Sequence, residues 1–245
     1  MATVKEISKM IDHSLLHPTM TDQDLKDGIE IAKKYDTASV CIKPYAVNMA
    51  AEMLSGTEVA VCTVIGFPHG GNLVEVKVFE TEKAIEDGAT EIDMVVNIGK
   101  VLSEDWDYID AEIEAIVKVT KAKNAMLKVI FENDFLPEDK YKIKLCEICG
   151  KHKVEFVKTS TGYGFVKGSD GKYSYKGATM EDLKLMRKHS APEVEIKAAG
   201  GVRTLEDTLK VREIGVTRIG ATATAAIVGE MTGQKTDKKE DPSGY

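Results

Sequence analysis

The 245-residue sequence has little of several features that define common protein classes. Its four cysteines are too few for the disulfide framework of a secreted domain of this size. No apolar run is long enough to cross a membrane, and the N-terminus has no apolar segment of the signal-peptide kind. These absences predict a cytoplasmic protein without membrane segments.

An excess of positive charge is also lacking. The chain has 33 Lys and Arg residues against 40 Asp and Glu residues, which gives a net charge of −7. Because nucleic-acid binding usually requires a basic surface, we expect no nucleic-acid partner. A phosphate group could still bind, but only at a local site made of backbone amides and individual cations.

Motifs for metals and dinucleotides are missing as well. The five histidines show neither H-x-H nor H-E-x-x-H spacing, and no G-x-G-x-x-G follows an apolar run. Cys146 and Cys149 form a C-x-x-C that could be a redox pair. They lie in a helical pattern, however, where free cysteines serve as small apolar side chains, and we favour that interpretation.

What the sequence does contain is a series of short runs rich in Val and Ile. Most lack polar alternation, which is typical of parallel strands buried on both faces. The predicted strands are 10–16, 39–44, 59–68, 91–99, 127–133, 155–161, 194–200 and 217–223.

Amphipathic helical patterns separate these runs. The first begins at Thr21 with Asp24 three residues later, the spacing of a capping box. Eight strand–helix units in a chain of this length predict a single-domain α/β fold, a (β/α)₈ TIM barrel over residues 1–232. A doubly wound open sheet is the alternative. Residues 233–245 form a polar tail that we expect to be mobile.

Four charged residues inside predicted strands are candidates for a functional role. Asp93 lies in the fourth, and Lys128, Lys158 and Lys197 lie in the fifth, sixth and seventh. A single lysine there could reach out of a strand end or pair with a carboxylate, but three on neighbouring strands favour a functional role. Two ammonium groups close together repel, so one amine becomes the neutral nucleophile of Schiff-base chemistry. Asp93 could pair with a lysine, relay protons, or do both.

Small residues follow the last three predicted strands. The segments are "STGYG", "AAGGVRT" and "RIGATATA". They let backbone amides approach a ligand, and barrels often bind phosphate at the loops after their last two strands. Thr222 or Thr224 is expected to cap the helix that follows. The pattern therefore predicts a phosphate site at these three loops.

These motifs resemble the deoxyribose-phosphate aldolase family of class I aldolases. The resemblance runs over nearly the whole chain, including "IDHSLLHPT", "CTVIGFPHG", "EIDMVVNIG", "VKTSTGYG" and "VEIKAAGGVRT". It implies a barrel, commonly a homodimer, that needs no metal or organic cofactor. The implied reaction is reversible cleavage of 2-deoxy-D-ribose 5-phosphate to D-glyceraldehyde 3-phosphate and acetaldehyde, a step of deoxyribonucleotide catabolism and carbohydrate degradation.

The resemblance also implies roles for individual residues. Lys158 matches the Schiff-base lysine. Lys197 matches the second lysine, which lowers the pKa of its neighbour and relays protons, and Asp93 matches the proton donor and acceptor. Tyr245 matches a C-terminal tyrosine that assists proton removal in some members, although a disordered end fits equally well. The implied substrate-binding residues are Cys41, Lys128, Thr161, Gly162, Gly200, Gly201, Gly220 and Thr222.

Two departures from the family pattern leave alternatives open. Ala223 stands where the family usually has a second serine, and the segment 166–177 is longer than usual. This segment could be a solvated turn, which we favour, or a lid over the anion. A related Schiff-base aldolase with a different or less phosphate-dependent acceptor is the nearest alternative function. A catalytically idle barrel that binds phosphorylated metabolites is another, and a lyase that uses metal-bound water has little support.

Overall fold

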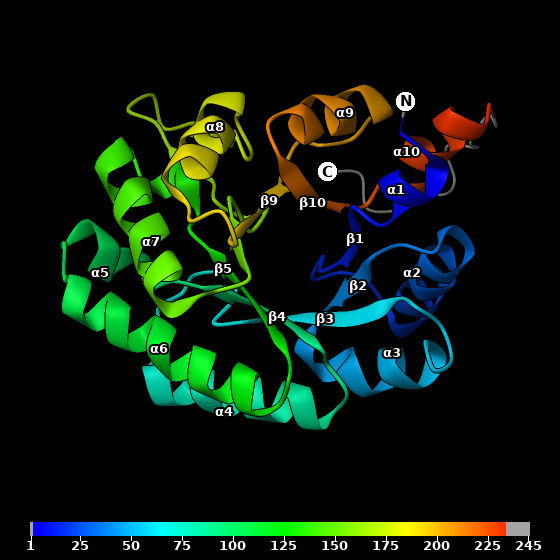
Figure 1. The fold of residues 1–245 in the computed structure, drawn as a ribbon, viewed down its shortest axis with the longest axis horizontal. Coiled ribbons are helices and arrows are strands. Elements are labelled where there is room, and N and C mark those ends of the chain that lie inside the picture. The colour runs from blue at the N-terminus through cyan, green and yellow to red at the C-terminus, as the bar shows by residue number, and fades with distance from the viewer. Residues whose placement is uncertain (1, 234–245) are drawn as a thin grey trace.

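The protein is a closed barrel of parallel strands surrounded by helices, described over residues 2–233 by a computed structural model (Figure 1). The strands follow one another around the barrel in the order β1-β10-β9-β6-β5-β4-β3-β2. Their bounds are β1 Ile11–Leu15, β2 Ser39–Ile42, β3 Ala60–Ile65, β4 Glu91–Val95, β5 Met126–Ile130, β6 Phe156–Lys158, β9 Glu195–Ala199 and β10 Val216–Ala221. The predicted (β/α)₈ fold is confirmed.

The helices form the outer layer of the barrel. They are α1 Val4–Ser8, α2 Asp22–Tyr35, α3 Val47–Met53, α4 Val74–Glu86, α5 Ile98–Leu102, α6 Trp106–Ala122, α7 Asp139–His152, α8 Met180–His189, α9 Leu205–Glu213 and α10 Thr224–Thr232, with 3₁₀ turns η1 Pro44–Ala46 and η2 Asn133–Phe135. The predicted capping box of α2 is confirmed, because the Thr21 side chain accepts from the Asp24 amide and the Asp24 side chain accepts from the Thr21 amide.

The eight strands lie inside or within one residue of the predicted runs and are shorter at their ends. The residues that follow each run continue into loops at one end of the barrel, where the site lies. Of the predicted tail, residues 234–245 lie outside the described residues, and so does Tyr245.

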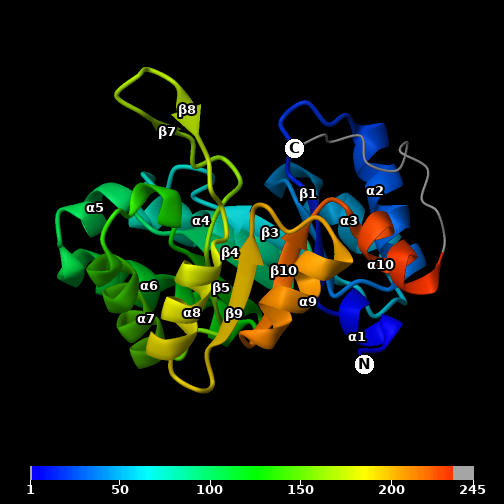
Figure 2. The same cartoon turned by 90° about the horizontal axis from the view of Figure 1, so that it is seen from above.

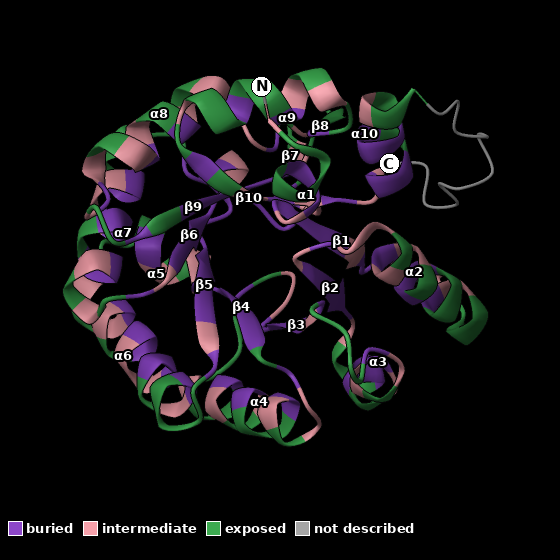
Figure 3. Ribbon diagram, turned by 45° about the vertical axis from the view of Figure 1, so that its right-hand side comes forward, coloured by how far each residue is buried: buried purple, intermediate pink, exposed green. Residues whose placement is uncertain are grey.

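The barrel strands are largely buried (Figure 3), and their side chains alternate between the helix layer and the barrel interior. On β5 and β9, Leu127, Val129, Ile196 and Ala198 belong to the large apolar core that includes helix residues such as Leu25, Ile109 and Leu183. The residues between them, such as Lys128 and Lys197, therefore point into the barrel interior. The same alternation on the other strands gives the interior its charged content.

A short antiparallel hairpin interrupts the connection between β6 and α8. It consists of β7 Val166–Lys167 and β8 Tyr173–Ser174, and it stands away from the barrel at the end where the strands finish (Figure 2). Its tip is exposed, as expected for a solvated turn. At its base, the rings of Phe165 and Tyr175 lie 5.5 Å apart, and both side chains line the cavity described below.

Two further expectations concern single elements. Cys146 and Cys149 are free and buried on α7, in agreement with the apolar interpretation of the C-x-x-C. Within residues 2–233, the helices all fall short of the length and apolar character that a membrane crossing requires.

Candidate active site

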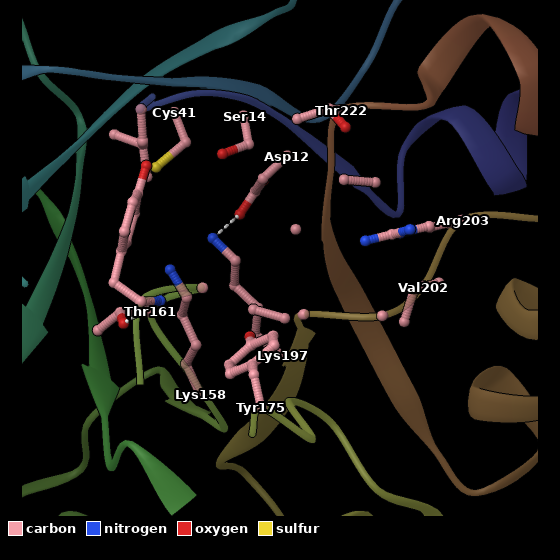
Figure 4. A pocket seen from close by; sticks show the side chains of 18 of the residues that line it. Asp12, Ser14, Cys41, Lys158, Thr161, Tyr175, Lys197, Val202, Arg203 and Thr222 are labelled. Atoms are coloured by element: carbon pink, nitrogen blue, oxygen red, sulfur yellow. Dashed lines mark hydrogen bonds and ion pairs between the residues drawn. The ribbon is translucent and has the colours of Figure 1, made fainter. Parts of the chain in front are cut away.

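A cavity of about 210 Å³ opens among the loops that follow the strands (Figure 4). This is the end at which barrel enzymes bind their substrates. The charged side chains in its wall come from different elements: Asp12 from β1, Lys158 from β6, Lys197 from β9 and Arg203 from the loop before α9. Strands far apart in the sequence therefore contribute to one site.

Two lysines of the interior share one acceptor atom. Lys158 Nζ and Lys197 Nζ each lie 2.7 Å from Asp93 Oδ2. Lys158 and Lys197 are register partners on the adjacent strands β6 and β9, so their side chains leave the barrel wall side by side. Asp93 lies below them on β4 and is fully buried.

A second group of charges lies beneath this trio. Lys128 Nζ is 2.6 Å from Glu91 Oε2 and 2.9 Å from Asp93 Oδ1. Arg218 Nη1 lies 2.6 Å from Asp12 Oδ1 and 3.1 Å from Glu91 Oε2. Ion pairs therefore continue without a gap from the barrel interior to the cavity floor.

The cations determine the charge of the buried carboxylates. Burial alone would raise the pKa of Asp93, but Lys128, Lys158 and Lys197 outweigh it and hold that pKa well below its usual range. The pKa of Asp12 is likewise lowered, because Lys128, Lys197 and Arg218 overcome the effect of burial. Both side chains are therefore carboxylates at neutral pH.

The carboxylates act in return on two of the lysines. Burial would lower the pKa of Lys197, but Asp12 and Asp93 raise it above its usual range, and Lys128 behaves in the same way. Both side chains are therefore ammonium ions. As cations, they can hold a developing negative charge or supply a proton, but they are not nucleophiles.

The number of anionic partners falls from the barrel interior towards the cavity. Lys128 is paired with Asp12, Glu91 and Asp93. Lys197 is paired with Asp12 and Asp93, at 2.5 and 2.7 Å. Lys158, which opens onto the cavity, has one ion pair among residues 2–233, with Asp93.

Glycines form the opposite wall of the cavity. Gly162, Gly200 and Gly201 have φ angles of +95°, +83° and +94°, a region in which side chains other than glycine are strained. A Cβ on Gly200 would also overlap the Tyr175 hydroxyl. These positions leave backbone amides open to a ligand.

Helix α10 begins beside this wall. Its N-cap is Ala223, without a side-chain hydrogen bond to the first turn. The prediction that Thr222 or Thr224 caps this helix is wrong, because Thr224 is the first helical residue and its hydroxyl meets His13 Nδ1 at 2.8 Å. The amides of the first turn therefore keep no side-chain cap, which suits an anion.

The structure brings most of the predicted site residues to the cavity. Those that line it are Cys41, Lys158, Thr161, Gly162, Lys197, Gly200, Gly201, Gly220 and Thr222. Asp93 and Lys128 lie below the lining, in the ion-pair layer. Thr161 lines the cavity, and its amide and hydroxyl both donate to Glu132.

Two charged residues of the cavity wall, Asp12 and Arg203, were not predicted. Asp12 lies in the apolar run 10–16, and an aspartate inside a predicted strand is the signal that identified Asp93. Arg203 lies in the quoted segment "AAGGVRT" and is the exposed cation beside the glycine wall. Both could have been found by the criteria applied to the lysines.

Two groups of buried side chains have the donor atoms of a metal site. They are Cys41 with Cys62 and Asp93, and Asp12 with Cys62 and Glu91. The ammonium groups of Lys128 and Lys197 already lie against these carboxylates. A metal ion would have to displace them, so this donor set fits the lysines better than a metal.

Comparisons with known proteins agree with this geometry. A sequence profile described as DeoC/LacD family aldolase matches residues 7–236. A deoxyribose-phosphate aldolase of Rhodopirellula baltica is 52% identical over 94% of this chain and 90% of its own length. One of Bacillus cytotoxicus is 48% identical over 91% of this chain and 94% of its own.

A solved structure agrees as well. The deoxyribose phosphate aldolase of Aeropyrum pernix, described as a unique tetramer, superposes with a TM-score of 0.82 and 27% identity, covering 94% of this chain and 92% of that one. Fold and cavity define a barrel lyase of the aldolase class. The chain belongs to the DeoC/LacD family of aldolases.

Proposed function

We propose that this aldolase cleaves 2-deoxy-D-ribose 5-phosphate reversibly to D-glyceraldehyde 3-phosphate and acetaldehyde through a Schiff base on Lys158. The single observation that carries the proposal is the shared contact of Lys158 and Lys197 with Asp93 Oδ2 at the floor of the cavity. The relatives described above, which have this activity by name, support the choice of substrate.

The charge balance of the interior supports Lys158 as the nucleophile. The ion pairs join three carboxylates, Asp12, Glu91 and Asp93, to three lysines and Arg218. An excess of buried positive charge is costly, and loss of one proton removes it. Among residues 2–233, Lys158 has the fewest anionic partners of the three lysines, and it faces the cavity, so it is the amine that we assign as the nucleophile.

The chemical steps follow from this arrangement. The neutral Lys158 amine attacks the C1 carbonyl of the open-chain sugar, and the carbinolamine takes up a proton and loses water to give an iminium ion. The C2–C3 bond then breaks. Its electron pair enters the iminium system to form an enamine, and the C3 hydroxyl loses its proton as D-glyceraldehyde 3-phosphate leaves.

The second half returns the enzyme to its starting state. The enamine takes up a proton at C2, and water hydrolyses the resulting iminium ion to acetaldehyde and the free amine. Lys197 is placed to give and take these protons because it lines the cavity, and Asp93 connects it to Lys158. The lysine and the carboxylate thus form the proton relay of the proposal.

The glycine wall supports phosphate as the anchor of the substrate. Gly162, Gly201 and Thr222 come from the loops after β6, β9 and β10, and the uncapped first turn of α10 lies beside them. The exposed cation Arg203 adds positive charge there. An anchored phosphate would hold C1 of the sugar at Lys158.

Reductive trapping tests the nucleophile. The protein is incubated with acetaldehyde and borohydride, and the modified peptide is mapped. We expect an adduct on Lys158, none in Lys158→Met, and unchanged labelling in Lys142→Met, which removes a buried lysine that pairs with Asp182 away from the cavity. An adduct on another lysine, with none on Lys158, would disprove the proposal.

The second candidate is a related aldolase whose acceptor depends less on phosphate. Ala223, the N-cap of α10, favours it, because position 223 has no side-chain hydroxyl for a phosphate oxygen. Comparing cleavage of 2-deoxyribose with and without the 5-phosphate separates the two. Pairing of copies, a cytoplasmic location, the extent of the domain and a role for Tyr245 stay predictions.

A further inference from the structure

Glu132 is a buried carboxyl group beside the cavity that the mechanism does not use. It follows β5 by two residues, has a left-handed φ of +57° and is fully buried. Its Oε2 accepts hydrogen bonds from the Thr161 amide, at 3.1 Å, and from the Thr161 hydroxyl. Burying a carboxyl group costs free energy of folding, so the burial of Glu132 calls for an explanation.

Glu132 holds the loop after β6 at more than one point. The Thr161 hydroxyl that donates to Glu132 also accepts from the Tyr163 amide at 2.9 Å. The other oxygen, Oε1, lies against Gly164, where an added Cβ would come within 2.6 Å of it. The side chain thus binds Thr161 through hydrogen bonds and packs closely against Gly164, at the two ends of the stretch 161–164.

This stretch connects the proposed nucleophile to the glycine wall. Lys158 lies three residues before Thr161, and Gly162, Tyr163 and Phe165 all line the cavity. A shift of the loop would move the wall proposed to hold the phosphate but would leave Lys158 on its strand.

We propose that Glu132 is a positioning residue, which holds residues 161–164 in the form that binds the phosphate of the substrate. The inference rests on the proposed function, because it assigns the phosphate to this wall. Glu132 itself does not line the cavity and acts through Thr161. Thr161 was expected to bind the substrate, but its amide and its hydroxyl both donate to Glu132.

The charge of Glu132 makes the attachment sensitive to pH. Burial raises its pKa to about 7, Asp134 acts in the same direction, and the Thr161 hydrogen bonds and Lys158 oppose the rise. An ionised carboxylate accepts hydrogen bonds more strongly than a neutral acid. The loop is therefore held more firmly above pH 7 than below it.

The test compares two substitutions with a matched control. Glu132→Leu removes the acceptor, and Glu132→Gln keeps an oxygen of the same shape that cannot ionise. Glu155→Gln is the control, because Glu155 Oε2 accepts from the Leu127 amide at 2.9 Å at the other end of the barrel. KM and kcat for 2-deoxyribose 5-phosphate and for 2-deoxyribose, and the rate of acetaldehyde trapping, are measured between pH 5.5 and 8.5.

Glu132→Leu is expected to raise KM for the phosphorylated sugar about tenfold or more, from the loss of two hydrogen bonds to a charged group. KM for 2-deoxyribose and the trapping rate on Lys158 should stay near those of the unsubstituted protein. Because the phosphate of the sugar itself titrates at about pH 6, the two proteins are compared by the ratio of their KM values, and the ratio of Glu132→Gln to the unsubstituted protein should change around pH 7. Glu155→Gln should match the unsubstituted protein throughout.

Two outcomes would overturn the inference. One is an unchanged KM for the phosphorylated sugar in Glu132→Leu, or an equal rise for both sugars together with lost trapping, which indicates a general structural role. The other is a Glu132→Gln profile that parallels the unsubstituted protein across pH 7. Absence of a Lys158 adduct in the unsubstituted protein would instead refute the proposed function, so the two failures are distinguishable.

Discussion

Lys158 and Lys197 direct their amino groups to the same oxygen atom, Asp93 Oδ2, from neighbouring strands of the barrel. One oxygen atom serves two nitrogens, and within residues 2–233 only Lys197 of the two has a second carboxylate, Asp12. The two lysines are therefore unequal although their backbones are in register. This asymmetry supports Lys158 as the proposed nucleophile.

Removing Lys197 should slow formation of the Schiff base. In Lys197→Met, the cavity loses the ammonium group that shares Asp93 Oδ2 with Lys158 and that is proposed to give and take protons. We expect acetaldehyde trapping at pH 7 to fall about 100-fold, the loss that removal of a general acid–base group typically causes. The measurement is the rate of borohydride trapping at pH 7.

Lys142→Met serves as the control for this experiment, since Lys142 is a buried lysine with two carboxylate partners outside the site. It should trap acetaldehyde as the unsubstituted protein does. A Lys197→Met protein that traps acetaldehyde as fast as the unsubstituted protein would show that Lys197 takes no part in forming the Schiff base.

The fold could be predicted from its repeated apolar runs, and the lysines could be predicted because they interrupt those runs. Buried parallel strands are nearly continuous apolar runs, so Lys158, Lys197 and Asp93 stand out within them. Asp12 was missed although it gives the same signal, because its run, "MIDHSLL", is the weakest of the eight. The alternation of side chains then places all four in the barrel interior.

Other parts of the site depend on tertiary contacts that no periodic pattern in the sequence predicts. Glu132 lies inside the predicted run 127–133, but the observed strand β5 ends at Ile130, and the Glu132 side chain is buried where the loop 161–164 folds against it. The base of the hairpin joins the cavity through Phe165 and Tyr175, which lie ten residues apart in a polar segment. No local pattern predicts either contact.

The buried carboxylates should give the protein a steep loss of stability in acid. The pKa values of Asp12 and Asp93 lie below their ordinary value of 3.8. A lowered pKa contributes stability that is complete above the ordinary value and is lost as the pH falls through the lowered one. Unfolding free energies, measured with urea, should therefore fall below about pH 4, as the carboxylates are protonated.

Asp12→Asn checks the source of this dependence. It should be less stable at pH 7 by about 3 to 5 kcal/mol, because a buried ion-pair network is broken. Its stability should change less between pH 5 and 3 than that of the unsubstituted protein. Asp182→Asn, which breaks the ion pair with Lys142 on the outer helices, should keep the steep dependence. Equal slopes for all three proteins would contradict the prediction.

Glu132 should have the opposite effect on stability. Its pKa rises from 4.5 to about 7 in the folded protein, so its contribution is complete below 4.5 and is lost as the pH rises through 7. Glu132→Gln does not ionise, and its stability relative to the unsubstituted protein should increase by about 3 kcal/mol between pH 4.5 and 8. Thermal unfolding at pH 4.5, 6, 7 and 8 measures this difference.

A constant difference between these two proteins at all four pH values would show that Glu132 does not titrate in this range. Ionisation of Glu132 at pH 8 is expected to lower the free energy of unfolding, and the same ionised group is proposed to hold the loop 161–164. A carboxylate that destabilises the barrel but holds the loop exchanges stability for function, as active sites commonly do.

The absence of a side-chain hydroxyl at the N-cap of α10 allows a test of the phosphate wall by a gain of contacts. Ala223 is the N-cap of that helix and makes no side-chain hydrogen bond. Ala223 has a ψ angle of 34°, outside the extended region from which a serine caps a helix, so the added hydroxyl of Ala223→Ser should leave the first-turn amides free for an anion. The hydroxyl can donate to a phosphate held there, so KM for 2-deoxyribose 5-phosphate should fall about three- to tenfold.

Comparison with the unphosphorylated sugar shows whether the lower KM of Ala223→Ser comes from a contact with the phosphate. If the phosphate lies at α10, KM for 2-deoxyribose should stay constant in Ala223→Ser while KM for the phosphorylated sugar falls. Ala225→Ser, three residues after Thr222 on a buried face of the helix, is a control that adds a hydroxyl away from the N-cap. An Ala223→Ser protein with an unchanged preference for phosphate would place the anion elsewhere and would favour the acceptor that depends less on phosphate.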